Sequence, residues 1–311
     1  MHLIEQLHRN VRTIAMPSAM VVGALLCRPI TALETASHQM ITPTLIFLML
    51  FVTFCRVSPK QMKPSMLHVW LLAFQIVMCV AVYLLLKPLD DVVAQGAMVC
   101  ILAPVAMAAV VIAGMLGANV ATMATYSLIC NMAIALVAPA ILTFTGTGEC
   151  TFAQILARIA PLLVGPFAAA QFCRFVFPKL AKWIGEHGQI SFYMWLMSLL
   201  VIIGRTTCFI IDLHDASIST ELWLAFAALV ICLGQFKVGR MLGRRYGDPP
   251  AGGQSLGQKN TVLAVWMAQS FLNPVSSIAP TAYIVWQNFV NSYQIYRKDQ
   301  EKLKKHSEEA R

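Results

Sequence analysis

Charged residues are scarce in this chain. Only 12% of its 311 residues are Asp, Glu, Lys or Arg, whereas 58% are hydrophobic. A soluble domain of this length cannot bury so much apolar side chain in one core. The composition therefore excludes an ordinary soluble enzyme and indicates a polytopic membrane protein.

Paired cysteines and spaced histidines are lacking as well. The nine cysteines lie about one helix apart and form no C-x-x-C pair, and no two histidines have the spacing of metal ligands. We therefore expect neither a structural disulfide nor a zinc site, and we interpret the cysteines as small apolar residues. The sequence also shows no nucleophile motif and no soluble output domain, so we expect no enzyme.

Apolar runs are abundant, and ten of them are long enough to be transmembrane helices. They cover residues of about 13–27, 41–55, 66–86, 92–114, 126–142, 152–172, 190–211, 221–236, 252–271 and 275–293. The first run could instead be a signal peptide with a cleavage region at 31–36. The sequence predicts an all-α membrane protein with ten transmembrane helices.

The excess of basic residues, a formal net charge of +9, has a topological explanation. With a cytoplasmic N-terminus, the loops after every second helix lie on the cytoplasmic side, and they contain Arg56, Lys60, Lys63, Arg174, Lys179, Lys182, Lys237, Arg240, Arg244 and Arg245. The opposite loops contain Asp90, Asp91, Glu149, Asp212 and Asp215. This asymmetry predicts two cytoplasmic termini in a membrane of the bacterial inner (plasma) membrane type. It does not indicate nucleic-acid binding, because the basic residues form no continuous face.

Two of the predicted spans are interrupted by polar residues and glycines. The stretch 254–260 places Lys259 where the chain enters the bilayer, and an ammonium group there costs several kcal/mol unless it is paired or wetted. The stretch 114–119 is a second candidate break, although its glycines could equally form a close helix contact. Each break falls in the fourth helix of a set of five. The sequence therefore predicts two inverted five-helix repeats with broken, crossing helices 4 and 9.

The predicted organisation has four parts. They are an N-terminal cytoplasmic segment (1–12), a first repeat (13–145), a second repeat (146–296) and a basic cytoplasmic tail (297–311).

Several motifs in these helices resemble the bile acid:sodium symporter family, which consists of ten-helix inverted-repeat carriers of organic anions. The motifs are Pro43, Lys63-Pro64 followed by Gln75, Gly117-Ala118-Asn119-Val120, Ser127 and Asn131 ahead of Pro139, Pro161-x-x-x-Gly165, and Ser255-Leu256-Gly257-Gln258-Lys259-Asn260. The resemblance implies two sodium sites in the family's helices. Asn119, Ser127 and Asn131 would keep oxygen ligands for the first site, and Gln75 for the second. Ser255 and Gln258 are further candidate ligands of these degenerate sites.

This chain departs from the family at both implied sodium sites. The glutamate that the two sites share is Ser255 here, and the glutamine of the second site is Lys259. Both sites thus lose their anionic ligand, and one gains a positive charge. The carbonyl end of a half-helix favours a cation, so the Lys259 ammonium could take the place of sodium.

From this resemblance we expect a secondary transporter that carries a bile acid, a steroid conjugate or a small carboxylate by alternating access. Asn119, Lys259 and Asn260 would contact the organic anion. We expect no cofactor beyond at most one sodium ion, and transport that is sodium-independent or proton-linked, because a buried lysine can lose its proton near neutral pH. The bilayer is the other expected partner, and we expect a monomer. Two alternatives stay open: a cation/proton exchanger in which Lys259 titrates, and a Lys259 that merely extends into a vestibule.

Overall fold

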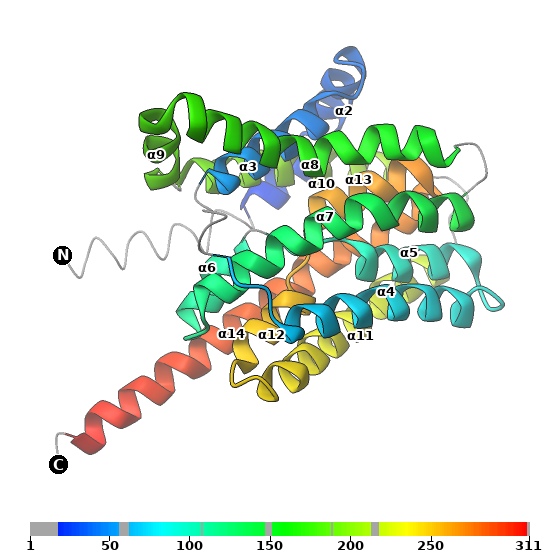
Figure 1. The fold of residues 1–311 in the computed structure, drawn as a ribbon. Coiled ribbons are helices and arrows are strands. Elements are labelled where there is room, and N and C mark those ends of the chain that lie inside the picture. The colour runs from blue at the N-terminus through cyan, green and yellow to red at the C-terminus, as the bar shows by residue number, and fades with distance from the viewer. Residues whose placement is uncertain are drawn as a thin grey trace. The chain divides into compact units, whose positions relative to one another are not determined.

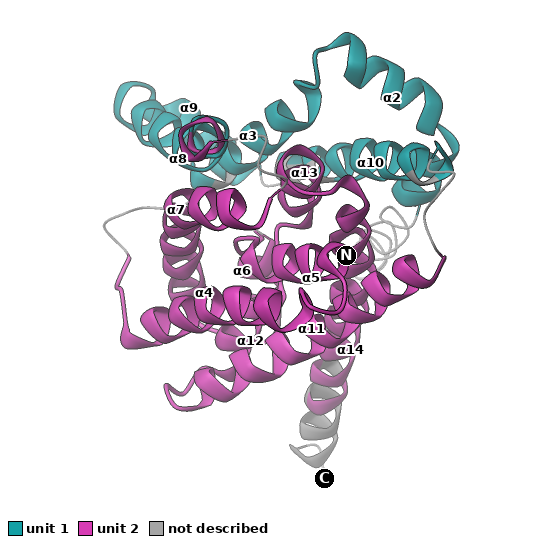
Figure 2. Cartoon of the chain, turned by 90° about the vertical axis from the view of Figure 1, so that its right-hand side faces the viewer, with its two compact units in different colours: residues 1–58, 157–217 teal, residues 59–156, 218–311 magenta. Residues whose placement is uncertain are grey.

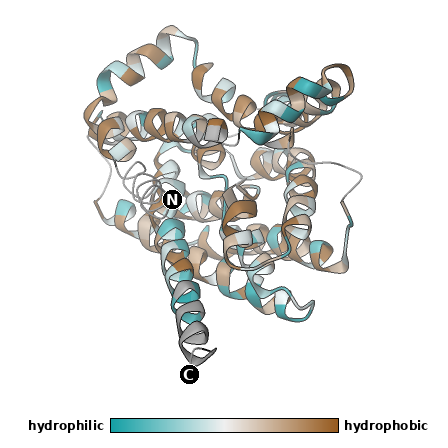
Figure 3. Ribbon diagram, turned by 90° about the vertical axis from the view of Figure 1, so that its left-hand side faces the viewer, coloured by the Kyte–Doolittle hydropathy of each residue, from teal (hydrophilic) through white to brown (hydrophobic). Residues whose placement is uncertain are grey.

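The computed structural model describes residues 18–55, 62–106, 108–146, 151–187, 189–212 and 218–309. These residues form helices joined by short connections, with one isolated β-bridge and no strand among them (Figure 1). Hydrophobic residues cover most of the helices, whereas several hydrophilic residues lie on α14 just before its grey end (Figure 3). The predicted all-helical class is confirmed.

Four helices of the described residues are long and apolar enough to cross a membrane. They are α4 (Met66–Leu86), α7 (Val120–Thr145), α8 (Phe152–Val176) and α11 (Ile218–Arg244). A bent pair, Ser18–Leu25 and α2 (Cys27–Ala36), would make a fifth span, with an angle of 76° between its two halves. Residues 31–36, the candidate cleavage region, are therefore helical. The composition and these helices together indicate an integral membrane protein.

The helices form two compact units (Figure 2). Unit 1 comprises residues 1–58 and 157–217, and unit 2 comprises 59–156 and 218–311. Each unit contains segments of both predicted repeats, so the units do not follow the division at residue 145. The repeats stay a prediction.

Unit 1 contains α2, α3 (Ile41–Phe54), most of α8, α9 (Pro178–Glu186) and α10 (Gln189–Asp212). Here α10 packs against α2 and α3. The Glu34 carboxylate, 1% exposed, accepts hydrogen bonds from the Thr42 backbone N–H at 3.2 Å and from Arg205 Nη1 at 3.1 Å. These contacts of Glu34 tie three helices of the unit together, since Glu34 lies on α2, Thr42 on α3 and Arg205 on α10.

In unit 2 the first break lies at a different position from the one that the sequence predicts. The sequence predicts one continuous helix over 92–114, but α5 (Asp91–Leu102) ends before Pro104 and α6 begins only at Ala108. Proline has no N–H for a helical hydrogen bond and disfavours helical geometry in the residue before it, which explains this end. The stretch 114–119 is instead the turn between α6 (Ala108–Met115) and α7, where Gly117 has a φ of 86°.

At the second predicted break the chain is not continuously helical, and the interruption is shorter than predicted. Helix α12 (Pro249–Gly257) includes the first part of the predicted stretch 254–260, and α13 (Thr261–Phe271) follows. Only residues 258–260 lie between these helices. The short helix η2 (Pro274–Ser277) then leads into α14 (Ile278–Glu309), which continues through most of the predicted tail.

Helices α11 and α12 of unit 2 pack backbone against backbone. A Cβ atom added to Gly239 would collide with the carbonyl oxygen of Gly252, and one added to Gly252 would collide with that of Gly239. The glycines therefore permit an approach that no side chain would allow. This close contact fixes α12, and with it the break that carries Lys259.

Candidate functional site

The two breaks of unit 2 lie side by side. Val105 and Lys259 form an antiparallel β-bridge. The Ala106 N–H donates to the Gln258 carbonyl at 2.9 Å, and the Asn260 N–H donates to the Pro104 carbonyl at 2.8 Å. Irregular backbone at membrane depth needs such partners, because lipid offers none. We call residues 103–106 and 258–260 the crossing.

Four helix ends meet near the crossing, and they differ in polarity. Helices α5 and α12 end there, whereas α6 and α13 begin within a few residues of it. The C-terminal end of a helix carries a partial negative charge and the N-terminal end a partial positive charge. The crossing therefore offers places that favour a cation beside places that favour an anion.

The ammonium of Lys259 lies at the carbonyl end of α5. Its side chain is 1% exposed, and Nζ donates to the Ile101 carbonyl oxygen at 3.0 Å. The thiols of Cys79, Cys100 and Cys130 are near enough to interact electrostatically with it. None of the ion pairs among the described residues includes Lys259. The lysine is enclosed within unit 2 and does not reach a vestibule at the surface.

Gln75 of α4 contacts two further carbonyls at the end of α5. Its Nε2 donates to Leu102 at 3.2 Å and to Ala103 at 3.0 Å. Its Oε1 accepts a hydrogen bond from the Tyr126 hydroxyl at 3.2 Å. Gln75 and Lys259 together satisfy three carbonyl groups that the helix end leaves without a helical partner.

A polar stripe on α14, which the sequence analysis missed, supports the other side of the crossing. It consists of Tyr283, Gln287 and Asn291. The Tyr283 hydroxyl donates to the Gly257 carbonyl at 2.9 Å, Gln287 Oε1 accepts from the Lys259 backbone N–H at 3.0 Å, and Asn291 Nδ2 donates to Gln258 Oε1. The signal was present in the sequence: three polar side chains at intervals of four residues lie on one face of a helix.

Two further predicted residues lie at or next to the crossing. Asn260 caps α13, since its Oδ1 accepts from the Leu263 N–H at 3.2 Å. Its Nδ2 is buried without a hydrogen-bond partner among the described residues. Ser255 lies one turn earlier on α12, and its hydroxyl donates to the sulfur of Met123 at 3.2 Å. These contacts place both residues in the interior of unit 2.

The residues predicted for the first sodium site are distributed differently. Ser127 and Asn131 lie together on α7, where Asn131 Nδ2 donates to the Ser127 carbonyl at 2.7 Å. Asn119 is exposed, and its Oδ1 caps α7 by accepting from the Ala121 N–H at 2.9 Å. Its own N–H donates to Asp248 Oδ2 at 2.9 Å. Helix α6 thus separates Asn119 from the crossing, because the actual break precedes that helix.

The residues at the crossing do not fit a sodium ion. Two oxygens that would ligate it, those of Gln75 and Gln258, already accept hydrogen bonds from Tyr126 and Asn291. The Lys259 ammonium adds a positive charge at the same place. Among the described residues there is also no group of three His, Cys, Asp or Glu side chains that could hold a metal ion.

The sequence of the chain matches no protein-family model and no curated protein. The resemblance to the bile acid:sodium symporter family therefore stays a prediction.

Proposed function

We propose that the chain is a secondary transporter that carries an organic anion by alternating access, with Lys259 as a fixed cation at its centre. One observation carries the proposal: two broken helical elements pair at the crossing, and a buried ammonium lies at the carbonyl end of α5. Discontinuous helices that meet at mid-membrane, with ions or substrates at their ends, are typical of secondary transporters. The resemblance stated above suggests the same class of substrate.

Ten spans in two inverted repeats fit the lengths of the broken elements. The segments 91–115 and 249–271 each contain more than the roughly 20 residues that a span requires, although neither forms one continuous helix. Each pair of half-helices would then count as one span, with its break near the middle. The bent pair at the N-terminus would count as another.

The two ends of unit 2 differ in charge, and this supports the predicted orientation. At one end, Asp248 contacts the α6–α7 turn, and the Lys298 side chain is close to the same turn at Gly117. Arg244 and Arg245 precede Asp248 in the chain. At the other end, Asp91 Oδ2 accepts from Gln95 Nε2, which also contacts the Thr145 carbonyl. Under the positive-inside rule the basic end is cytoplasmic.

Lys259 would act in two ways in this transporter. It occupies the carbonyl end of α5, where a mobile coupling cation would otherwise be favoured, so transport would not require sodium. An ammonium group has three donors, and the Ile101 carbonyl takes one of them. We propose that the anionic group of the substrate binds the others once the crossing opens to one side of the membrane.

Ligand screening followed by counterflow tests the function. Purified protein is screened with bile acids, steroid conjugates and small carboxylates for a rise in the unfolding temperature. The best ligand is then used in proteoliposomes, and we expect preloaded unlabelled anion to accelerate entry of the labelled anion. No stabilisation by any anion, together with proton-driven cation exchange in the absence of an anion, would favour the cation/proton exchanger instead.

The orientation makes a separate prediction about accessibility. Leu89 and Tyr246 are 81% and 43% exposed and lie at the acidic and the basic end of unit 2. In intact cells we expect an impermeant maleimide to label a Leu89→Cys variant but not a Tyr246→Cys variant, and to label both after permeabilisation. The unmodified chain is the control, because all eight of its described cysteines are buried. Labelling of both variants from outside would contradict the orientation.

A further inference from the structure

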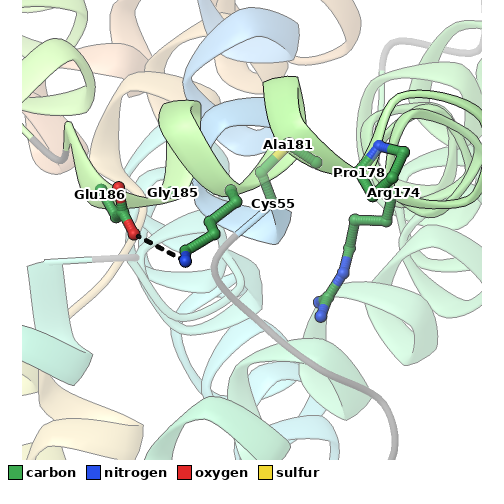
Figure 4. A pocket seen from close by; sticks show the side chains of 7 residues that line it. Cys55, Arg174, Pro178, Ala181, Gly185 and Glu186 are labelled. Carbon is green, nitrogen blue, oxygen red and sulfur yellow. Dashed lines mark ion pairs between the residues drawn. The ribbon is translucent and has the colours of Figure 1, made fainter.

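Unit 1 contains a pocket of about 470 Å³ next to the short helix α9. Cys55, which directly follows α3, lines it together with Arg174 of α8 and Ala181, Lys182 and Glu186 of α9. Figure 4 shows Cys55 between Glu186 and Arg174 in this view. Every residue that lines the pocket belongs to unit 1, and the transport function proposed above makes no use of it.

Positive charge predominates in the lining of this pocket. Arg174 lies in the last turn of α8 and Lys182 on the following helix, so the residues that line the pocket include two cations and one acid, Glu186. Lys182 Nζ is 3.8 Å from Glu186 Oε1, and these side chains are 79% and 61% exposed. An ion pair with such exposed side chains and such a large separation of its charged atoms contributes little stability. An incoming anion can therefore compete with Glu186 for the lysine.

Helix α9 has the form of a helix that lies in the membrane interface. It contains nine residues and is therefore too short to span a bilayer. Ala181 is buried, whereas Leu180 and Trp183 are 49% and 50% exposed and lie close to lysines in the sequence. Tryptophan and amphipathic helices with basic residues are typical of the headgroup region.

Exposed aromatic residues adjoin the pocket where α8 leads into α9. Phe175 is 88% exposed and Phe177 is 54% exposed, and they lie between Arg174 and Pro178, two residues that line the pocket. Such apolar surface beside a cationic pocket matches a ligand with a phosphate headgroup and acyl chains. A soluble anion has no acyl chain that could contact this apolar surface.

We propose that this pocket binds the phosphate headgroup of an anionic phospholipid, with Arg174 and Lys182 as its cationic contacts. The topology predicted from the sequence, in which Arg174, Lys179 and Lys182 belong to a cytoplasmic loop, places α9 at the cytoplasmic leaflet, and basic residues near that surface attract its anionic lipids. The site thereby anchors α9 in the interface. Because binding can be measured on purified protein, its outcome is independent of whether the chain transports an anion.

The test measures binding of dioctanoyl phosphatidylglycerol to the purified full chain by native mass spectrometry and by the rise in unfolding temperature. We expect about fivefold weaker binding for Lys182→Gln, and roughly 30-fold weaker binding when Arg174→Gln is added, since each of the two cations that line the pocket would contribute about 1 kcal/mol. Lys179→Gln is the matched control. It removes the same charge from the same helix, but Lys179 does not line the pocket, so we expect a change below twofold.

Three results would overturn the proposal. Equal weakening by Lys179→Gln and Lys182→Gln would show diffuse attraction without a site. Inorganic phosphate or glycerol 3-phosphate binding as tightly as the lipid would assign the pocket to a soluble anion. Equal binding of dioctanoyl phosphatidylcholine would show that the negative charge is not recognised. If the double variant unfolds without lipid, the exposed Lys182→Gln change alone decides between these outcomes.

Discussion

Replacing Lys259 with methionine is expected to abolish anion exchange without destabilising the protein. Burying an ammonium group costs several kcal/mol, and the only hydrogen-bond acceptor that the described residues offer its Nζ is the Ile101 carbonyl. Methionine has a similar shape and no charge. The lost hydrogen bond, worth about 1.5–3 kcal/mol, should be offset by the charge that is no longer buried. We therefore expect the free energy of unfolding of the variant to be at most about 2 kcal/mol lower than that of the unmodified chain, or to be higher.

The expected loss of exchange is much larger. Removing one partner of a buried charged contact typically costs about 2–5 kcal/mol, so counterflow should decrease by about 30-fold or more. Lys298→Met is the control, because Lys298 lies at the basic end of unit 2, close to the turn at Gly117. Its loss should change exchange by less than about twofold. Normal exchange in a stably folded Lys259→Met variant would show that the lysine has no role in transport.

Replacing Gly239 with alanine is expected to give the largest loss of stability. The new Cβ would collide with the carbonyl oxygen of Gly252, and backbone atoms cannot rotate away as a side chain can. Helices α11 and α12 would have to separate, which disturbs the break at 258–260 as well. We expect the free energy of unfolding in detergent to decrease by about 3 kcal/mol or more, and exchange to be lost with it.

Gly234→Ala provides the matched control on the same helix. Nothing lies within 4 Å of a Cβ atom at this position. Alanine has a higher helix propensity than glycine, so we expect no loss and a gain of up to about 1 kcal/mol. Denaturation curves of the two variants measure the difference. Equal effects at Gly234 and Gly239 would contradict the close packing of α11 on α12.

The sequence predicts the helical class and the second break because both have strong local signals. Long apolar runs identify the helices, and Lys259 beside Asn260 is too polar for a continuous span. The first break has no such signal, since residues 103–106 read Ala-Pro-Val-Ala and only Pro104 indicates an interruption. The glycines at 114 and 117 instead suggested a break where the chain simply turns.

The partners of Lys259 depend on tertiary structure. Its ammonium contacts Ile101, 158 residues earlier in the chain, and its N–H contacts Gln287, 28 residues later. No local pattern links these positions, because helix packing alone brings them together. The sequence shows that the polar residues of α14 lie on one face of that helix, but it does not show that this face contacts the end of α12.

The sodium dependence of transport tests most directly whether the Lys259 ammonium stands in place of a coupling cation. Counterflow of the best-bound anion is measured in proteoliposomes with sodium on both sides and then with potassium. We predict equal rates for the unmodified chain, and a requirement for sodium once Lys259→Gln and Ser255→Glu are combined to remove the ammonium and supply a carboxylate. A strict sodium requirement in the unmodified chain would contradict the account.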